Sequence, residues 1–208
     1  MVNVGYGRQK LALDTRNCRR IIYDSLVLAG RIFERLLPFL KECDIATLSN
    51  RCLITGLGSV KRGEVLTATR LNERLRFLKY EGGEYFKPHC DGMYMTPDHK
   101  EKSYFTMHLY LNGDGEQSTD ELLHEQNRMD MDNTTIINKD PSAKLLGGAT
   151  SFLLCSMATQ NNGVKIFPKT GSVLIFQHNG LMHAGDDIFR GVKYTMRTDI
   201  MYRQEKHT

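Results

Sequence analysis

Two short stretches of the sequence carry side chains that could bind a metal ion together. His89 and Asp91 lie two residues apart in the stretch YFKPHCD, and on a strand such residues point to the same side. His183 follows the apolar segment VLIFQHNGLM, and Lys193 comes ten residues later. The His-x-Asp pair alone would equally suit an exposed strand with a polar face. The distant histidine and lysine favour a metal site.

Two histidines and one carboxylate form the facial ligand set that non-haem Fe(II) oxygenases use. Three protein ligands leave open positions for a bidentate cosubstrate and for dioxygen. A dicarboxylate cosubstrate such as 2-oxoglutarate then needs a cation at its far end, which Lys193 or an arginine could supply. The same three ligands could instead bind zinc in a hydrolase or in a cupin-like metal protein. Lys193 would have no evident purpose in that arrangement.

The order of the hydrophobic patterns predicts helices first and strands afterwards. Apolar residues recur at helical spacing between Ile21 and Leu37, which predicts one or two helices within residues 14–41. Pro38 is expected to kink or end that pattern. From Leu75 onward the spacing changes to two, and strands are expected at 75–80, 103–112, 151–156, 163–167, 172–178 and 193–202. These elements indicate an α+β fold with a β-sandwich or barrel core.

Residues 113–145 form a polar segment that interrupts the series of strands, and its first half is acidic. A connection of this length within a compact domain is usually mobile or functional. Residues 120–129 could form a short helix. We hypothesise that the segment is a lid at the mouth of the site and that its acidic half suits a basic partner.

Bulk composition sets limits on the class of protein. A chain of 208 residues is long enough for one domain with a sizeable core. No apolar run of about 18 residues predicts a membrane span, and the N-terminus has no signal-peptide pattern. The net charge of +4 is too small to indicate a nucleic-acid partner, and nothing indicates an oligomeric state. Five widely spaced cysteines without a C-x-x-C pair favour reduced thiols in the cytoplasm or nucleus.

Five stretches of the chain resemble the 2-oxoglutarate- and Fe(II)-dependent dioxygenases of the prolyl 4-hydroxylase type. They are RFLKYEGGEYFKPHCDG (76–92), LYLN (109–112), LLGGATSF (145–152), FPKTGSVLIFQH (167–178) and HAGDDIFRGVKYTMRTDIMYR (183–203). They follow one another in the family's order and cover most of residues 75–203. The N-terminal region resembles the family's covering helices less specifically.

The resemblance implies a double-stranded β-helix, a jelly-roll or cupin-like core, with N-terminal covering helices. Residues 1–208 would form a single domain, with a helical cover at about 14–45, a β core at about 52–203 and the polar insertion at 113–145. His89 and Asp91 would sit at the end of one strand and His183 on a facing strand, and the three would bind Fe(II).

The resemblance also assigns residues to 2-oxoglutarate. Lys193 matches the family's lysine or arginine that pairs with the far carboxylate of the cosubstrate. Tyr80 and Tyr110 match residues that lie near the cosubstrate. Arg197 departs from the plainer family pattern, but it shares a strand face with Lys193. It could therefore contact the cosubstrate, a substrate carboxylate or Asp199.

Three further residues are candidates for a substrate pocket. Arg76 shares the face of Tyr80 and could bind an acidic group of the substrate, although a packing or salt-bridge role would also suit it. His108 shares the face of Tyr110 and could line the pocket or be a satisfied core histidine. Thr150 belongs to the stretch GGATSF and could help to shape the pocket.

The reaction implied by the resemblance is hydroxylation of a C–H bond with O₂ and 2-oxoglutarate, with release of succinate and CO₂. Ascorbate could be a further requirement. A peptidyl residue such as proline is the favoured substrate. Hydroxylation of a free amino acid or another small molecule is the alternative within the same class. A non-catalytic metal-binding barrel is the alternative outside it, and the intact set of His89, Asp91, His183 and Lys193 argues against that barrel.

Overall fold

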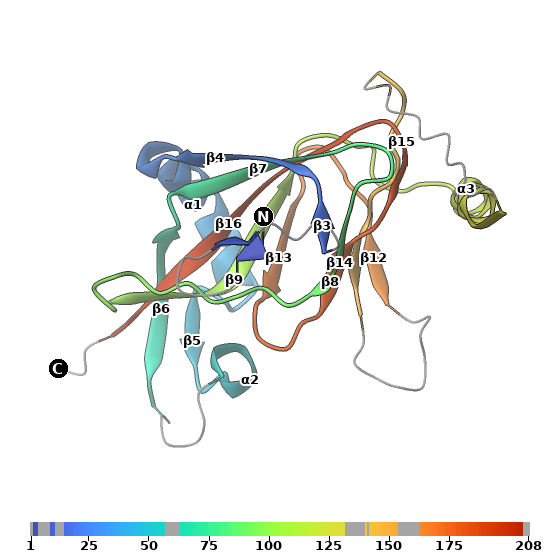
Figure 1. Cartoon of the computed structure of the whole chain (residues 1–208). Coiled ribbons are helices and arrows are strands. Elements are labelled where there is room, and N and C mark those ends of the chain that lie inside the picture. The colour runs from blue at the N-terminus through green and yellow to red at the C-terminus, as the bar shows by residue number, and fades with distance from the viewer. Residues whose placement is uncertain are drawn as a thin grey trace.

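The computed structural model describes residues 2–3, 9–10, 15–56, 63–131, 140, 142–153 and 163–205. In this part of the chain, two antiparallel β-sheets face each other across a shared interior, as in a flattened barrel (Figure 1). This is the predicted double-stranded β-helix.

The larger sheet has seven strands and is organised around β16. One edge of β16 pairs with β9, and the other edge pairs first with β7 and then with β6. The strands are β13 (Val173–Gln177), β9 (Glu101–Tyr110), β16 (Lys193–Gln204), β6 (Val65–Leu71) and β5 (Thr47–Ser49), with β7 (Arg74–Tyr80) beside the first half of β16 and β4 (Arg19–Asp24) beside β7.

The smaller sheet has five short strands. In order they are β12 (Val164–Ile166), β11 (Thr150–Phe152), β14 (His183–Gly185), β8 (Tyr85–His89) and β3 (Arg16–Asn17). Two separate pairs join β1 (Val2–Asn3) to β2 (Gln9–Lys10) and β10 (Leu146–Gly147) to β15 (Ile188–Arg190). Because β3 belongs to the smaller sheet and β4 to the larger one, the chain passes from one sheet to the other near Cys18 (Figure 1).

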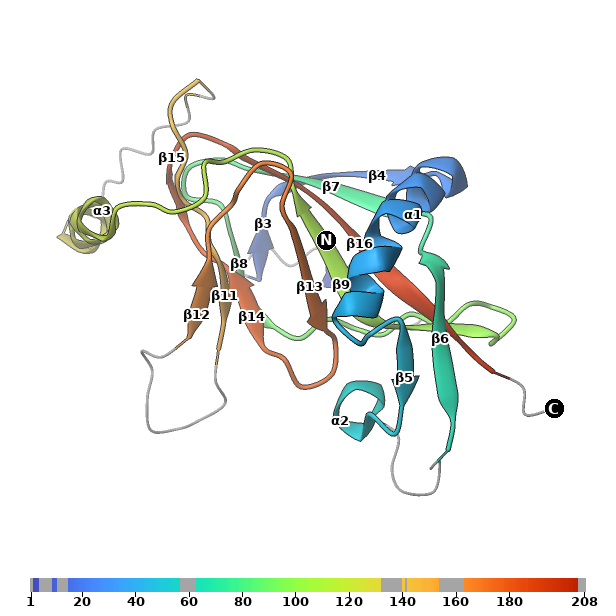
Figure 2. The ribbon, with the colours of Figure 1, turned by 180° about the vertical axis from the view of Figure 1, so that it is seen from behind.

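The two faces of the larger sheet serve different purposes, because side chains alternate along each strand. On β16, Lys193 and Arg197 point into the interior between the sheets, whereas Met196 and Ile200 point outward. Helix α1 (Leu26–Glu42) covers the outward face (Figure 2). The hydrophobic core lies between them and comprises Ala29, Leu36, Leu40, Leu48, Leu66, Ala68, Leu71, Leu75, Tyr104, Phe105, Met107, Met196, Ile200 and Tyr202.

The sequence prediction placed the start of the helical region too early. Residues 16–17 and 19–24 are strands, and the helix begins after Ser25, whose side-chain oxygen accepts a hydrogen bond from the Leu28 amide at 3.2 Å. Strand β4 has largely exposed residues on both faces, so no alternation distinguished it from the helical stripe that follows. Pro38 does not end α1, which continues to Glu42.

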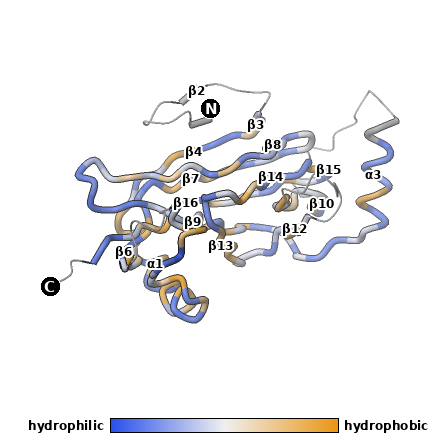
Figure 3. Tube along the Cα trace, turned by 90° about the horizontal axis from the view of Figure 1, so that it is seen from below, coloured by the Kyte–Doolittle hydropathy of each residue, from blue (hydrophilic) through white to orange (hydrophobic). Residues whose placement is uncertain are grey.

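The β core also begins earlier than the predicted residue 52, because β3, β4 and β5 precede it and residues Cys52–Thr55 form the short helix α2. The helix predicted within the polar insertion is confirmed as α3 (Thr119–Met131). Figure 3 shows that α3 is mostly hydrophilic and stands apart from the sheets, whereas α1 carries hydrophobic positions. The remainder of the insertion, 132–139 and 141, lies outside the described residues, and its role as a lid stays a prediction.

Two further findings concern the helices and the cysteines. None of the helices in the described ranges is both long and apolar enough to cross a membrane. Cys18, Cys43, Cys52 and Cys90 are free thiols. Cys155 lies outside the described residues.

Candidate metal centre

A β-bulge in β8 sets the direction of His89. Where β14 pairs with β8, His183 lies opposite His89 and Gly185 lies opposite Phe86, so two steps on β14 match three on β8. Regular alternation would put Phe86 and His89 on opposite faces of the strand. The extra residue, in the stretch that contains Pro88, lets both side chains line the same interior pocket.

The two histidines come from neighbouring strands of the smaller sheet. His183 is the first residue of β14, and His89 is the last residue of β8. The expectation that His183 comes from a facing strand is therefore wrong. Strand β14 has only three residues, too few for a pattern to reveal its partner. Asp91 lies just beyond the end of β8 and is almost fully buried.

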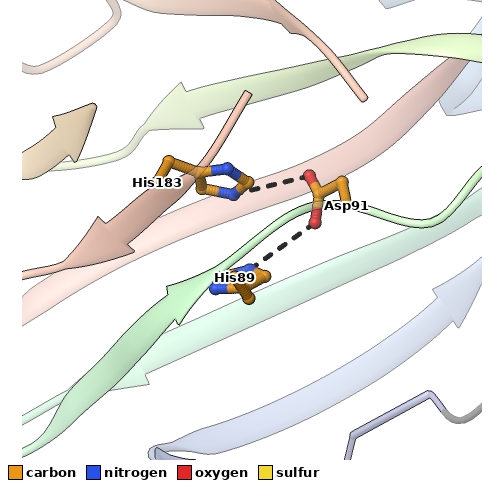
Figure 4. Close-up of side chains that lie close together, drawn as sticks. All are labelled: His89, Asp91 and His183. Carbon is orange, nitrogen blue, oxygen red and sulfur yellow. Dashed lines mark ion pairs between the residues drawn. The ribbon is translucent and has the colours of Figure 1, made fainter. Parts of the chain in front are cut away.

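His89, Asp91 and His183 converge on one point (Figure 4). The Nε2 atom of His89 is 3.6 Å from Oδ1 of Asp91, and Nε2 of His183 is 3.7 Å from Oδ2. Atoms bound to one ion lie at most about 4.2 Å apart, which is twice the metal–ligand distance, and both histidine–carboxylate separations meet this limit. One ligand atom from each residue lies within 4.8 Å of the others, so the three side chains are close enough together to be candidate ligands of one metal ion.

The protonation of both histidines also fits a metal ion. Nδ1 of His89 donates to the Lys87 carbonyl at 2.8 Å, and Nδ1 of His183 donates to the Leu181 carbonyl at 3.2 Å. Because a carbonyl only accepts, the neutral form of each ring has its Nε2 lone pair towards Asp91. Burial lowers the pKa of His183 to about 4, which keeps its ring neutral as metal binding requires. Nε2 of His89 is buried without a partner among the described residues.

Asp91 is held ionised by partners on the larger sheet. Nη2 of Arg197 lies 2.7 Å from its Oδ1, and the Thr106 hydroxyl donates to its Oδ2 at 2.5 Å. Burial alone would raise the pKa of Asp91, but Arg197, the two histidines and Thr106 hold it well below its usual range. Arg197 therefore contacts the predicted metal-binding carboxylate, a contact that the sequence prediction did not include. It also lies 3.9 Å from Asp199, which is one of the three partners that the sequence analysis left open.

Replacing Arg197 by methionine is expected to destabilise the metal-free protein by about 3–5 kcal/mol, because it leaves Asp91 charged, buried and without its main partner. A bound divalent cation would replace the missing charge, so most of the loss should disappear in the metal-loaded protein. Urea unfolding with a chelator and with excess Mn(II) measures the difference, and Arg197→Lys is the charge-conserving control. An equal loss with and without metal would show that Arg197 does not act through Asp91.

Lys193 is a buried cation with no acidic partner in contact among the described residues. It is 3% exposed. Its Nζ donates to the Gly148 carbonyl at 2.6 Å and lies 5.5 Å from the ring centre of Tyr80 and 5.6 Å from that of Tyr110. Burial lowers its pKa to about 8, against a smaller opposing effect of Asp186. An ammonium group in this environment is poised to bind an anion.

The backbone at Gly148 leaves room for Lys193. Gly148 has a φ of +71°, and an added Cβ would lie 2.3 Å from Cδ1 of Ile188 and 3.2 Å from Cδ of Lys193. Gly148→Ala is expected to lose about 1–3 kcal/mol of unfolding free energy from the backbone alone and to weaken binding of 2-oxoglutarate. Chemical denaturation and calorimetry measure the two effects. Gly30→Ala, in an open position of α1, should be neutral or stabilising, and similar losses in both variants would contradict the prediction.

The other predicted residues line the same pocket as the two histidines and Lys193. This lining includes Tyr80, Arg76, His108, Thr150 and Arg197. Tyr110 lies next to this lining, because its ring centre is 4.9 Å from that of His108 and its hydroxyl donates to Thr150 at 2.7 Å. The structure thus brings together every predicted site residue. The ligand-binding role of each stays a prediction.

Sequence reasoning missed four residues of the site. They are Thr106, Phe86, Phe176 and Arg16. Thr106, His108 and Tyr110 are spaced two residues apart on one strand, so their side chains share a face. Alternation could therefore have predicted Thr106. Phe86 stacks on His89 with ring centres 3.6 Å apart, but the bulge hid its direction. Arg16 was assigned to a helix, so no signal placed it here.

The sequence model of the 2OG-Fe(II) oxygenase superfamily matches residues 75–198. This match spans more than half of the chain and both halves of the candidate metal centre. The chain belongs to this superfamily. It is an oxygenase of the 2-oxoglutarate- and Fe(II)-dependent class, and the family resemblance predicted from the sequence is confirmed at this level.

Solved structures similar to this oxygenase include prolyl hydroxylases. The viral collagen prolyl hydroxylase of Paramecium bursaria Chlorella virus 1 shares 16% identity, with a TM-score of 0.48 over 91% of this chain and 80% of its own. A Pseudomonas putida prolyl-4-hydroxylase shares 15%, with a TM-score of 0.49 over 95% and 74%. A Trichoplax adhaerens prolyl hydroxylase, solved with a hypoxia inducible factor peptide fragment, shares 12%, with a TM-score of 0.37 over 92% and 85%. No curated protein matches this oxygenase by sequence. We therefore base the assignment on the family model and the site.

Proposed function

We propose that this oxygenase hydroxylates a C–H bond of a peptidyl residue such as proline, with His89, Asp91 and His183 as its iron ligands. The observation that carries the proposal is a pair of complementary sites in one pocket. Two imidazole Nε2 atoms and a carboxylate converge at one end, and the ammonium of Lys193 lies buried with no acid of the described residues in contact. A metal ion and a dicarboxylate satisfy both at once. Proline as the substrate is supported by the sequence resemblance to prolyl 4-hydroxylases.

Each part of the pocket has a defined task in this reaction. Fe(II), when bound, supplies the oxidation chemistry, which consumes 2-oxoglutarate and O₂ and releases succinate and CO₂. Lys193 binds the far carboxylate of 2-oxoglutarate and fixes the orientation of the cosubstrate. Tyr110 stays protonated, since burial raises its pKa to about 12, so its hydroxyl holds Thr150 in place. Phe86 and Phe176 form apolar walls that limit the access of water.

The proposal is tested first by ligand binding and then by turnover. Anaerobic thermal unfolding should show stabilisation by Fe(II) with 2-oxoglutarate, about 2.7 kcal/mol at a ligand concentration of 100 times Kd. Succinate formation is then measured with proline-containing peptides and with free amino acids in parallel. Stimulation by the peptides supports the proposed substrate, whereas stimulation by free amino acids alone favours the small-molecule alternative. No effect of 2-oxoglutarate on unfolding would overturn the proposal. A requirement for ascorbate stays a prediction.

A further inference from the structure

The pocket that contains the metal centre is lined by charges of one sign. Among the described residues its lining includes Arg16, Arg76, Lys193 and Arg197 but no carboxylate. The acids paired with Arg197 and Arg76 are Asp91 and Asp199, whose side chains are only 3% and 4% exposed. The rest of the lining is apolar or uncharged apart from its histidines: Leu78, Tyr80, Phe86, His89, His108, Thr150, Phe176, His183, Ala184 and Gly185. In such surroundings an unmatched charge interacts more strongly than it would in water.

A positive charge remains when the ligands of the proposed function are present. The two charges of Fe(II) and that of Lys193 are matched by Asp91 and by the two carboxylates of 2-oxoglutarate. Arg76 and Arg197 then share a single acid, Asp199, at 3.2 Å and 3.9 Å. One positive charge is therefore left without counting Arg16. A substrate with one negative charge would neutralise it.

Donor groups also remain unused at this place. Arg76 contacts Asp199 through Nη1 only, so Nε and Nη2 have no partner among the described residues. Nε of Arg197 and Nε2 of His108 are likewise buried without a partner in that part of the chain. The strand register places Arg76 beside Arg197 and Arg197 beside His108, so the three form a row across β7, β16 and β9. A carboxylate can accept two parallel hydrogen bonds from one guanidinium group.

The neighbouring strand β4 adds to the positive field. Arg20 lies opposite Leu78 in the pairing of β4 with β7 and so shares the face of Arg76. Burial lowers the pKa of Arg20, and the charges of Arg16, Arg76 and Arg197 lower it further. This repulsion shows that the arginines lie close enough to act on one another. A bound anion would relieve it.

We propose that the oxygenase selects substrates that carry a carboxylate close to the carbon to be hydroxylated, and that Arg76 is the residue that binds it. Arg76 lines the pocket with 21% of its side chain exposed, and its Nε and Nη2 have no partner among the described residues, so these donors are open to a ligand. The inference rests on the proposed function and narrows its substrate to acidic peptides or acidic amino acids.

The experiment uses calorimetry on protein saturated with Mn(II) and 2-oxoglutarate. The probes are matched pairs of an acid and its amide. One set consists of blocked proline tripeptides with glutamate or glutamine beside the proline. The other set consists of free acidic amino acids and their amides. The acidic member of at least one pair should bind tenfold or more tightly than its amide. Equal affinities, or no binding of either member in every pair, would overturn the inference. Tight binding of acidic tripeptides or of acidic amino acids identifies the source of the carboxylate.

Variants on β7 test which residue binds the carboxylate of the substrate. Arg76→Gln should lower the affinity for the acidic probe about tenfold and leave the affinity for 2-oxoglutarate unchanged. Arg76→Lys keeps the charge and should recover part of the loss, which also covers the case that Arg76→Gln folds poorly. Arg74→Gln, on the same strand but outside the pocket and paired with Asp24, is the matched control and should bind as the wild type does. If Arg76→Gln retains full discrimination, Arg76 does not bind the carboxylate.

The same measurements separate this inference from the proposed function. Failure of 2-oxoglutarate to bind the Mn(II)-loaded protein would refute the proposed function itself. Normal binding of 2-oxoglutarate without any preference for acidic probes would refute only the carboxylate subsite.

Discussion

Replacement of His183 by alanine is expected to remove all 2-oxoglutarate-dependent succinate formation and to weaken metal binding strongly. The Nε2 atom of His183 faces Asp91 at 3.7 Å from a buried position, and among the described residues His89 is the one other histidine of this cluster. Loss of an outer-shell partner typically lowers metal affinity about 10–100-fold, so loss of a ligand should lower it about 100-fold or more. Titration with Mn(II) measures the affinity, and succinate formation with Fe(II) measures turnover. His89→Ala should behave in the same way.

A histidine outside the site provides the control for this substitution. His124 is on α3 with 76% of its side chain exposed, so His124→Ala should bind metal and turn over as the wild type does. Thermal unfolding of the metal-free variants shows whether each one is folded. A folded His183→Ala protein that still forms succinate from 2-oxoglutarate would show that the ligand set is wrong.

The affinity for 2-oxoglutarate is expected to fall as pH rises through the pKa of Lys193. Only the protonated amine attracts a carboxylate, and burial lowers this pKa to about 8 in the free protein. Below about pH 7 the lysine is charged and the affinity should be constant. Above pH 8 the affinity should fall towards tenfold per pH unit, because one proton must be taken up for each cosubstrate bound. Calorimetry with Mn(II)-loaded protein between pH 6.5 and 9.5 measures this slope.

Lys193→Met isolates the contribution of the charge. Charge-assisted hydrogen bonds contribute about 1.5–3 kcal/mol, so the variant should bind 2-oxoglutarate about 10–100-fold more weakly and without the loss above pH 8. Its metal affinity should be unchanged, because Lys193 makes no hydrogen bond or ion pair with the three proposed metal ligands. A variant that keeps the pH-dependent slope would assign the titration to another group.

The sequence predicted the site best where strands are long. Residues 75–80, 103–112 and 193–202 alternate clearly, and the family resemblance assigned Tyr80, Tyr110 and Lys193 on them to the site. Tyr80 and Lys193 line the pocket, and Tyr110 lies against its lining residues His108 and Thr150. Burial of one face fixes the register of such strands, so the pattern carries reliable information about direction.

The parts that the sequence did not predict depend on contacts between distant segments. The bulge in β8 is a property of its pairing with β14, and neither strand is long enough to show it. The ion pair between Arg197 and Asp91 joins residues more than 100 positions apart, and only the packing of the two sheets brings them together. Strand β4 was assigned to a helix because its residues are largely exposed on both faces, which removes the alternation that identifies a strand.

Strand β16 lines the pocket with residues on one face and contributes to the hydrophobic core with residues on the other. Lys193 and Arg197 line the pocket, whereas Met196 and Ile200 belong to the hydrophobic core on the face that α1 covers. Pocket lining and core packing are therefore divided between alternate residues of one strand. A homologue could change the lining at 193 while it keeps Met196 and Ile200, which pack in the hydrophobic core.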